Sequence, residues 1–185
     1  DAAGQESRVD FMHANRSSAK FLRREGYQAA ALSTHLGEMV FVLPDEGITP
    51  ESLLEDPEFL SRLDLNGEDR RIGEVQWSVP KFDVDSQLNL LEMLKELGIT
   101  DLQDTDKADL SALTNLSAYL SDAVQLARVK VDEEGVEAAA VTMLMERCLS
   151  APINPEICVM DLNRPFLFVI RSENIPLFIG VVNQM

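Results

Sequence analysis

Two apolar runs near the end of the chain restrict the fold most strongly. Residues 166–170 and 175–182 are almost wholly apolar, but each is only as long as a strand, and Pro176 and Gly180 interrupt the second run. Both are far shorter than the roughly 18 apolar residues that a membrane helix needs. The polar residues 172–174 separate them. They therefore predict two buried strands joined by a turn.

The remaining patterns alternate strands with short helices. A helix is expected to begin at Thr49, which precedes a proline and an acidic residue, and another short helix is expected over residues 57–63. From Ser86, leucines recur at helical spacing up to Gly98, which predicts an amphipathic helix with a glycine C-cap. The predicted strands cover residues 27–32, 38–43, 71–82, 119–131, 167–170 and 177–182. We expect one α+β domain over residues 1–185 in which sheets dominate.

The charge of the chain limits its partners. With 32 acidic and 16 basic residues, the formal net charge is -16. Such a field repels phosphate backbones and anionic lipid, so neither nucleic acid nor a membrane surface is expected as a partner. A solvated acidic surface is the ordinary explanation of such a composition.

No pattern for catalysis or cofactor binding stands out. Only two histidines are present, His13 and His35, and neither accompanies a serine or cysteine nucleophile motif. Phosphate-binding loops and zinc-ligand spacings are absent from the sequence. Cys148 and Cys158 either form one loop disulfide or stay free. We expect no enzyme, no metal and no cofactor.

The segment after the strand 119–131 is the most unusual. Gly135 is followed within three residues by three consecutive alanines. Propensity alone allows a buried helix over residues 136–149, in which case the chain would be an unrelated α+β binding module. The sequence around the segment favours a different interpretation.

That sequence resembles the serpin family over nearly its whole length. The similar blocks follow one another in the family's order, and the Met-Val-Phe-Val-Leu-Pro-Asp-Glu-Gly stretch at residues 39–47 is the longest before the hinge. The blocks cover residues 26–28, 39–47, 79–82, 94–99, 108–111, 131–142, 163–168 and 176–180. The resemblance implies the C-terminal half of a single serpin domain, with a reactive loop and hinge within residues 133–155.

In serpins an exposed loop is attacked by a serine protease, and the cut loop inserts as an extra strand into a sheet. The resemblance therefore implies a suicide-substrate inhibitor acting through residues 135–150. The hinge would comprise Glu133, Glu134, Gly135, Val136, Glu137, Ala138, Ala139, Ala140, Val141 and Thr142. Val136, Ala138, Ala140 and Thr142 share one parity and are small enough to enter a packed interior, whereas Glu137 falls on the opposite parity.

The resemblance also suggests where the loop is cut. If Glu133 is counted as the first hinge residue, the seventeenth is Leu149, so the Leu149–Ser150 bond is favoured. This bond would suit a protease like chymotrypsin or elastase. The alternative, Arg147–Cys148, would suit a trypsin-like protease. The stretch after Leu149 is longer than the family pattern, which also leaves room for a cut further along.

Serpins are considerably longer than 185 residues. The expected partners are therefore a target serine protease and the missing N-terminal half of the same protein. The resemblance favours a secreted protein. A serpin-like carrier, chaperone or storage protein without inhibitory action is the alternative.

Two Asn-x-Ser triplets, at Asn15 and Asn115, are weak signals for glycosylation.

Overall fold

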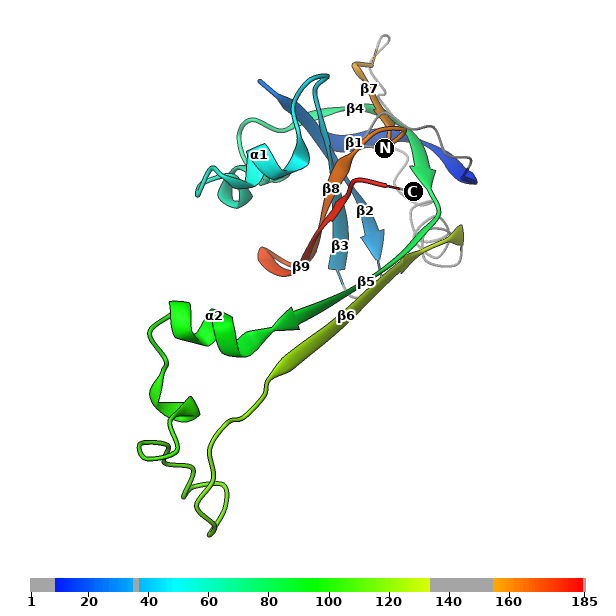
Figure 1. The fold of residues 1–185 in the computed structure, drawn as a ribbon. Helices are drawn as coiled ribbons and strands as arrows, with labels where there is room; N and C mark the ends of the chain where they lie inside the picture. The colour runs from blue at the N-terminus through cyan, green and yellow to red at the C-terminus, as the bar shows by residue number, and fades with distance from the viewer. Residues whose placement is uncertain (1–8, 35–36, 134–154, 185) are drawn as a thin grey trace. The chain divides into compact units, whose positions relative to one another are not determined.

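The computed structural model describes residues 9–34, 37–133 and 155–184. The strands are β1 (Phe11–Arg24), β2 (Tyr27–Thr34), β3 (Gly37–Pro44), β4 (Arg71–Pro80), β5 (Phe82–Asn89), β6 (Val124–Val131), β7 (Ile157–Asp161), β8 (Phe166–Ser172) and β9 (Ile175–Val182). The helices are α1 (Pro50–Leu54), α2 (Leu90–Glu96) and the short 3₁₀ helices η1 (Leu60–Arg62) and η2 (Asp101–Gln103). The predicted sheet-rich α+β class is thus confirmed (Figure 1).

Two compact units make up the chain, one of residues 1–82 with 131–185 and the other of residues 83–130. The first unit contains a seven-stranded sheet in the order β7-β4-β1-β2-β3-β8-β9. Its neighbouring strands are antiparallel, except that β7 runs parallel to β4. In the second unit, β5 and β6 form a two-stranded sheet, and α2 and η2 lie between them in sequence.

Both faces of the central strands are covered, which explains their nearly continuous apolar sequence. On one face, Phe59, Leu63 and Leu65, from the segment around η1, join the core residues Leu22, Val40 and others of β1, β2, β3 and β8. An aromatic cluster lies elsewhere in the core, where the Phe41 ring contacts Trp77 and Phe166 at centroid distances of 5.7 and 6.1 Å. Strands β3 and β8 are consequently buried almost throughout.

Several predicted elements have different bounds in the structure. The helix expected from Ser86 begins only at Leu90, because β5 continues to Asn89, whose side chain caps the helix. The C-terminal glycine of that helix, Gly98, has a φ of 81°, as predicted for a C-cap. The strand expected from residue 119 begins at Val124.

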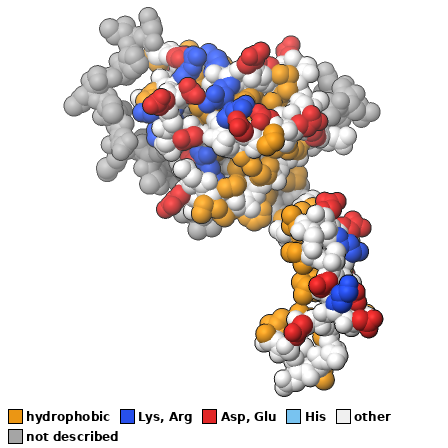
Figure 2. Space-filling view, turned by 90° about the vertical axis from the view of Figure 1, so that its left-hand side faces the viewer, with side chains coloured by type: hydrophobic (Ala, Val, Ile, Leu, Met, Phe, Trp, Pro, Cys, Tyr) orange, Lys and Arg blue, Asp and Glu red, His pale blue; other side chains and the backbone are white. Residues whose placement is uncertain are grey.

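The second apolar run differs in burial from the prediction. Strand β9 forms as expected but lies at the end of the sheet, and its first five residues are exposed in the described part of the chain. Further apolar side chains are exposed in the second unit, among them Leu97, Leu113 and Leu116. Figure 2 shows hydrophobic side chains at the surface between acidic and basic ones. Within the described residues, no helix has the length and apolar character that crossing a membrane requires.

Candidate functional site

The segment that the sequence singles out joins β6 to β7. Of the predicted hinge, only Glu133 is among the described residues. The rest of the hinge (residues 134–142) and both candidate bonds, Leu149–Ser150 and Arg147–Cys148, lie outside them. What the structure provides is the attachment of the loop at its two ends.

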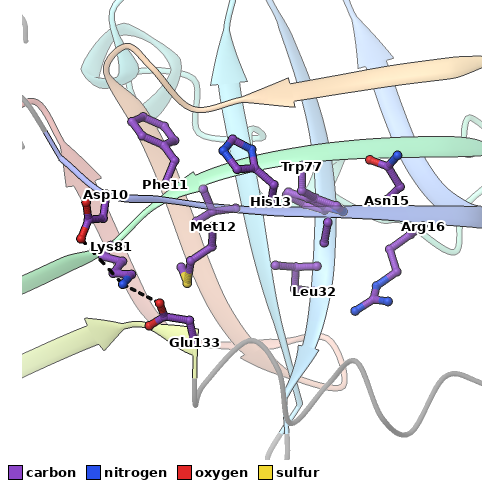
Figure 3. Close-up of a pocket in the computed structure, with 12 residues that line it drawn as sticks. Asp10, Phe11, Met12, His13, Asn15, Arg16, Leu32, Trp77, Lys81 and Glu133 are labelled. Carbon is purple, nitrogen blue, oxygen red and sulfur yellow. Dashed lines mark ion pairs between the residues drawn. The ribbon is translucent and has the colours of Figure 1, made fainter.

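At the upstream end, one lysine binds two carboxylates. The Lys81 ammonium lies 2.5 Å from the Glu133 carboxylate and 3.9 Å from that of Asp10. The Lys81 backbone N–H also donates to the Asp10 carbonyl at 2.9 Å. Figure 3 shows Lys81 between the two acids. We call Lys81 with Asp10 and Glu133 the upstream anchor.

The upstream anchor is a surface feature, since Lys81 and Glu133 side chains are 36% and 51% exposed. The hydrogen bond from Lys81 lowers the pKa of Glu133, and the same bond raises the pKa of Lys81. Both groups are therefore charged near neutral pH. Water screens this pair, so it positions the start of the loop without holding it firmly.

A cavity of about 550 Å³ adjoins this anchor. Met12, Leu32 and Trp77 supply apolar wall, and Arg16 projects to the same side of β1 as Met12 (Figure 3). The buried indole N–H of Trp77 has no hydrogen-bond partner among the described residues. The predicted hinge thus starts, at Glu133, beside a partly apolar cavity in the unit of residues 1–82 and 131–185.

The downstream end is held by more contacts. Glu156 accepts from the guanidinium groups of Arg71 at 2.6 Å and Arg23 at 3.2 Å. Arg23 also donates to the Ile157 carbonyl at 3.0 Å, and the Gln28 amide donates to the Val159 carbonyl. These bonds add to the parallel pairing of β7 with β4. We call Arg23, Gln28 and Arg71, with their bonds to residues 156–159, the downstream anchor.

Cys158 lies beneath the downstream anchor as a free, fully buried thiol. Its sulfur is 3.6 Å from the Gln28 side-chain oxygen. Burial raises the pKa of the thiol to about 11, so it stays protonated and unreactive near neutral pH. Of the two alternatives for these cysteines, a loop disulfide or free thiols, the structure shows Cys158 as a free thiol. Cys148 lies outside the described residues.

Strand β6, which leads into the predicted hinge, has β5 as its only strand partner in the part of the chain that the structure describes. The Arg128 guanidinium on β6 makes a two-pronged bond to Asp83 on β5, at 2.7 and 2.5 Å. This bond lowers the pKa of Asp83. A strand is added to a sheet through backbone hydrogen bonds along the edge of an existing strand.

Comparison with known proteins identifies the fold. The model of the family described as "Serpin (serine protease inhibitor)" matches residues 2–185. The chain belongs to the serpin family. The resemblance found in the sequence is thereby confirmed, and serpins as a family are protease inhibitors rather than catalysts.

Serpins of several animals are similar to this chain. Alpha-1-antitrypsin 1-5 of Mus musculus is 38% identical over 149 residues, which are 77% of this chain and 34% of that protein. Serine protease inhibitor 88Ea of Drosophila melanogaster is 34% identical over 150 residues, which are 77% of this chain and 34% of that protein. The chain thus spans about a third of the length of these curated relatives.

Solved serpin structures agree with the model. The native state of the thermophilic serpin tengpin matches with a TM-score of 0.75 and 30% identity, covering 100% of this chain and 48% of that one. Native protease nexin-1 with heparin matches with a TM-score of 0.74 and 29% identity, covering 100% and 50%. The serpin-like fold is therefore shown, for about half the length of these structures.

The sequence patterns did not predict all residues of the two anchors. Lys81 lies in the matched block at residues 79–82, although its pairing with Glu133 was not predicted. Arg23, Gln28 and Arg71 were missed as a group, because their sequence positions are far from Glu156 and only the strand order brings them together. None of the residues that the structure describes form a cluster of three or more His, Cys, Asp or Glu suited to a metal ion.

Proposed function

We propose that the full-length protein carrying this chain inhibits a serine protease as a suicide substrate. The protease would cut within residues 135–150, and the freed hinge would enter the sheet beside β6. The observation that supports this most directly is that the strand leading into the hinge, β6, pairs only with β5 within the described residues.

The chemistry of the cut follows from serine protease action. The protease serine would attack the carbonyl carbon of Leu149 and form an acyl-enzyme, and the amine of Ser150 would leave with a proton. Strand insertion would then move the attached protease before water hydrolyses the ester. Because insertion adds backbone hydrogen bonds and buries small side chains, the inserted state is lower in free energy than the intact one.

The two anchors support a mechanism in which the part of the loop before the cut moves and the part after it stays in place. The part before the cut begins at the upstream anchor, whose Lys81–Glu133 pair is exposed enough to break readily. The part after the cut is fixed to β7 by the downstream anchor. A cut at Leu149–Ser150 would therefore release the upstream part and leave the downstream part in place.

The proposed partner is a protease with an apolar specificity pocket, like chymotrypsin or elastase, because Leu149 would precede the cut. A trypsin-like protease remains the alternative, through Arg147–Cys148. We also propose a secreted protein, on the grounds of its family. The isolated 185-residue chain is not expected to trap a protease, since it spans about half of a solved serpin.

A pair of matched variants tests the mechanism. The full-length protein would be incubated with chymotrypsin, elastase and trypsin, and SDS-resistant complexes and the moles of inhibitor used per mole of protease would be measured. In an inserted strand, residue 138 would face the interior and residue 137 the solvent. We therefore expect Ala138→Arg to be cleaved without trapping, with consumption raised roughly tenfold or more because burying an unpaired charge costs several kcal/mol.

Glu137→Arg is the control, because the same side chain at the neighbouring position would stay in solvent. It should inhibit like the parent protein. Cleavage of the parent without a covalent complex and without a gain in thermal stability would instead support a non-inhibitory carrier, chaperone or storage protein. Edman sequencing of the released C-terminal piece would locate the cut.

A further inference from the structure

The two Asn-x-Ser triplets have no part in the proposed inhibition, and the structure places them in very different settings. One triplet is Asn15-Arg16-Ser17 and the other is Asn115-Leu116-Ser117. Such a triplet is the recognition pattern for attachment of an N-linked oligosaccharide, which is a bulky surface modification. Whether a triplet can be used depends on access to its backbone as well as to its asparagine.

Asn115 lies in an exposed bend between η2 and β6, within the unit of residues 83–130. Asn115, Leu116 and Ser117 are all exposed. The turn before them closes at Thr114, whose N–H donates to the Leu110 carbonyl at 3.1 Å. The Leu116 N–H donates to the hydroxyl of Thr114, two residues earlier, at 3.2 Å. The triplet is thus outside any strand ladder and can be reshaped locally.

Asn15 differs although its side chain is also exposed. It lies within β1, where it is paired with Gln76 of β4. The same triplet runs into the irregularity between Arg16 and Ala19, where Ser18 has a φ of 58°. Bending Asn15 into an enzyme cleft would require breaking the β1–β4 ladder, which contributes to the main core.

The surroundings of Asn115 add a reason for a sugar at this position. Leu113 is 84% exposed and Leu116 is 77% exposed, and Tyr119 is half-exposed. Clustered exposed apolar side chains favour association between molecules. A hydrophilic oligosaccharide on the residue between the two leucines would cover them from solvent.

We propose that Asn115 is the acceptor of an N-linked oligosaccharide. The Asn115 side-chain nitrogen would form a bond to the anomeric carbon of a sugar carried on a lipid pyrophosphate. The bond from that carbon to the pyrophosphate oxygen breaks, the lipid pyrophosphate leaves, and one amide proton is lost to the enzyme's base. The Ser117 hydroxyl is the second element that the transferring enzyme recognises. Asn15 in the folded protein is not an acceptor.

The test is site-specific glycopeptide mapping of the full-length protein expressed in a eukaryotic secretory host. Trypsin cuts after Lys107 and Arg128, so Asn115 falls in the peptide of residues 108–128. We expect that peptide to carry an oligosaccharide, and peptide-N-glycosidase in heavy-oxygen water to convert Asn115 to labelled Asp. Asn115→Gln and Ser117→Ala should each abolish the modification completely, whereas Asn15→Gln should leave it unchanged.

A second arm uses folded protein made in a host without this modification. It would be incubated with microsomal oligosaccharyltransferase and a dolichol-pyrophosphate oligosaccharide, and Asn115 alone should be modified. An unmodified 108–128 peptide in both arms, while an accepted control glycoprotein is modified alongside, would overturn the proposal. Modification of Asn15 in the folded protein would overturn the argument from strand pairing. Neither readout depends on protease inhibition.

Discussion

The two ends of the loop are attached in opposite ways. The upstream anchor consists of one lysine between two exposed acids, at the end of β6. The downstream anchor combines two arginines on one carboxylate, a glutamine on a backbone carbonyl and the pairing of β7 with β4. A screened ion pair such as Lys81–Glu133 breaks easily, whereas a strand ladder such as β7 on β4 does not.

This difference suggests a direction for the loop's movement. In the proposed mechanism the part before the cut has to travel and the part after it has to stay. The Lys81–Glu133 pair, at the described start of that part, is polar and partly exposed, so little is lost when it breaks. If the comparison is right, perturbing the downstream anchor should destabilise the fold, and perturbing the upstream anchor should change only local opening.

The largest effect is expected from Gly73→Ala in the full-length protein. An added Cβ at Gly73 would lie 2.1 Å from the Glu156 carbonyl oxygen, so β4 and β7 would have to separate. Such overpacking typically costs about 1–3 kcal/mol, which lowers the Tm of the full-length protein by at most roughly 2–4 °C per kcal/mol. Calorimetry measures the shift.

The control for this substitution is Gly67→Ala. Its Cβ would meet the end of the flexible Asp64 side chain at 3.0 Å, and that side chain can move. The two variants add the same methyl group. Equal Tm values for Gly73→Ala and Gly67→Ala would show that close packing of β7 on β4 contributes little.

An intermediate effect is expected from the double variant Arg23→Met, Arg71→Met. Both changes keep most of the side-chain stem but leave Glu156 without its two cations. Because these side chains are partly exposed, we expect a loss of roughly 1 kcal/mol in unfolding free energy. Amide exchange over residues 157–161 should become faster. Arg70→Met is the control, because Arg70 donates to the backbone carbonyls of Asn66 and Gly67 and has no bond to residues 156–159 among the described residues.

How much of this was predictable depends on the range of the interactions. Thr49 and Gly98 were correctly placed as caps, because capping is decided by neighbours within one turn. The start of α2 was wrong by a few residues, because leucines at helical spacing also fit the end of β5. The exposure of β9 could not be foreseen from its composition, since an apolar strand is expected to be covered on both faces.

The two anchors also show that local interactions could be predicted from the sequence and long-range ones could not. The resemblance to serpins indicated the hinge through local sequence, and Lys81 was inside a matched block. The downstream anchor joins residues from β1, β2 and β4 to residues 156–159, more than 80 residues apart in every case. Such contacts follow from strand order and register, which single-sequence patterns do not specify.

The smallest effect is expected from the upstream anchor, and it should depend on pH. The pKa of Glu133 is lowered in the folded protein, so the contribution of its pair with Lys81 is present above the ordinary glutamate pKa. That contribution is lost as the pH falls through the lowered value. The protection of the amides at residues 131–133, measured relative to their intrinsic exchange rates at each pH, should therefore decrease as the pH falls through the lowered pKa of Glu133, with little change in Tm near neutral pH.

A charge exchange separates this pair from general acid effects. Glu133→Lys and Lys81→Glu should each speed exchange at the start of the loop near neutral pH, because each places like charges together. The double variant restores an opposite pair and should recover slow exchange. Amide exchange in β7 should be the same in all three variants, because the bonds that hold β7 involve neither Lys81 nor Glu133. If either single variant lowered Tm as much as Gly73→Ala, the two ends of the loop would be equally firm, and the direction of release argued above would have no structural basis.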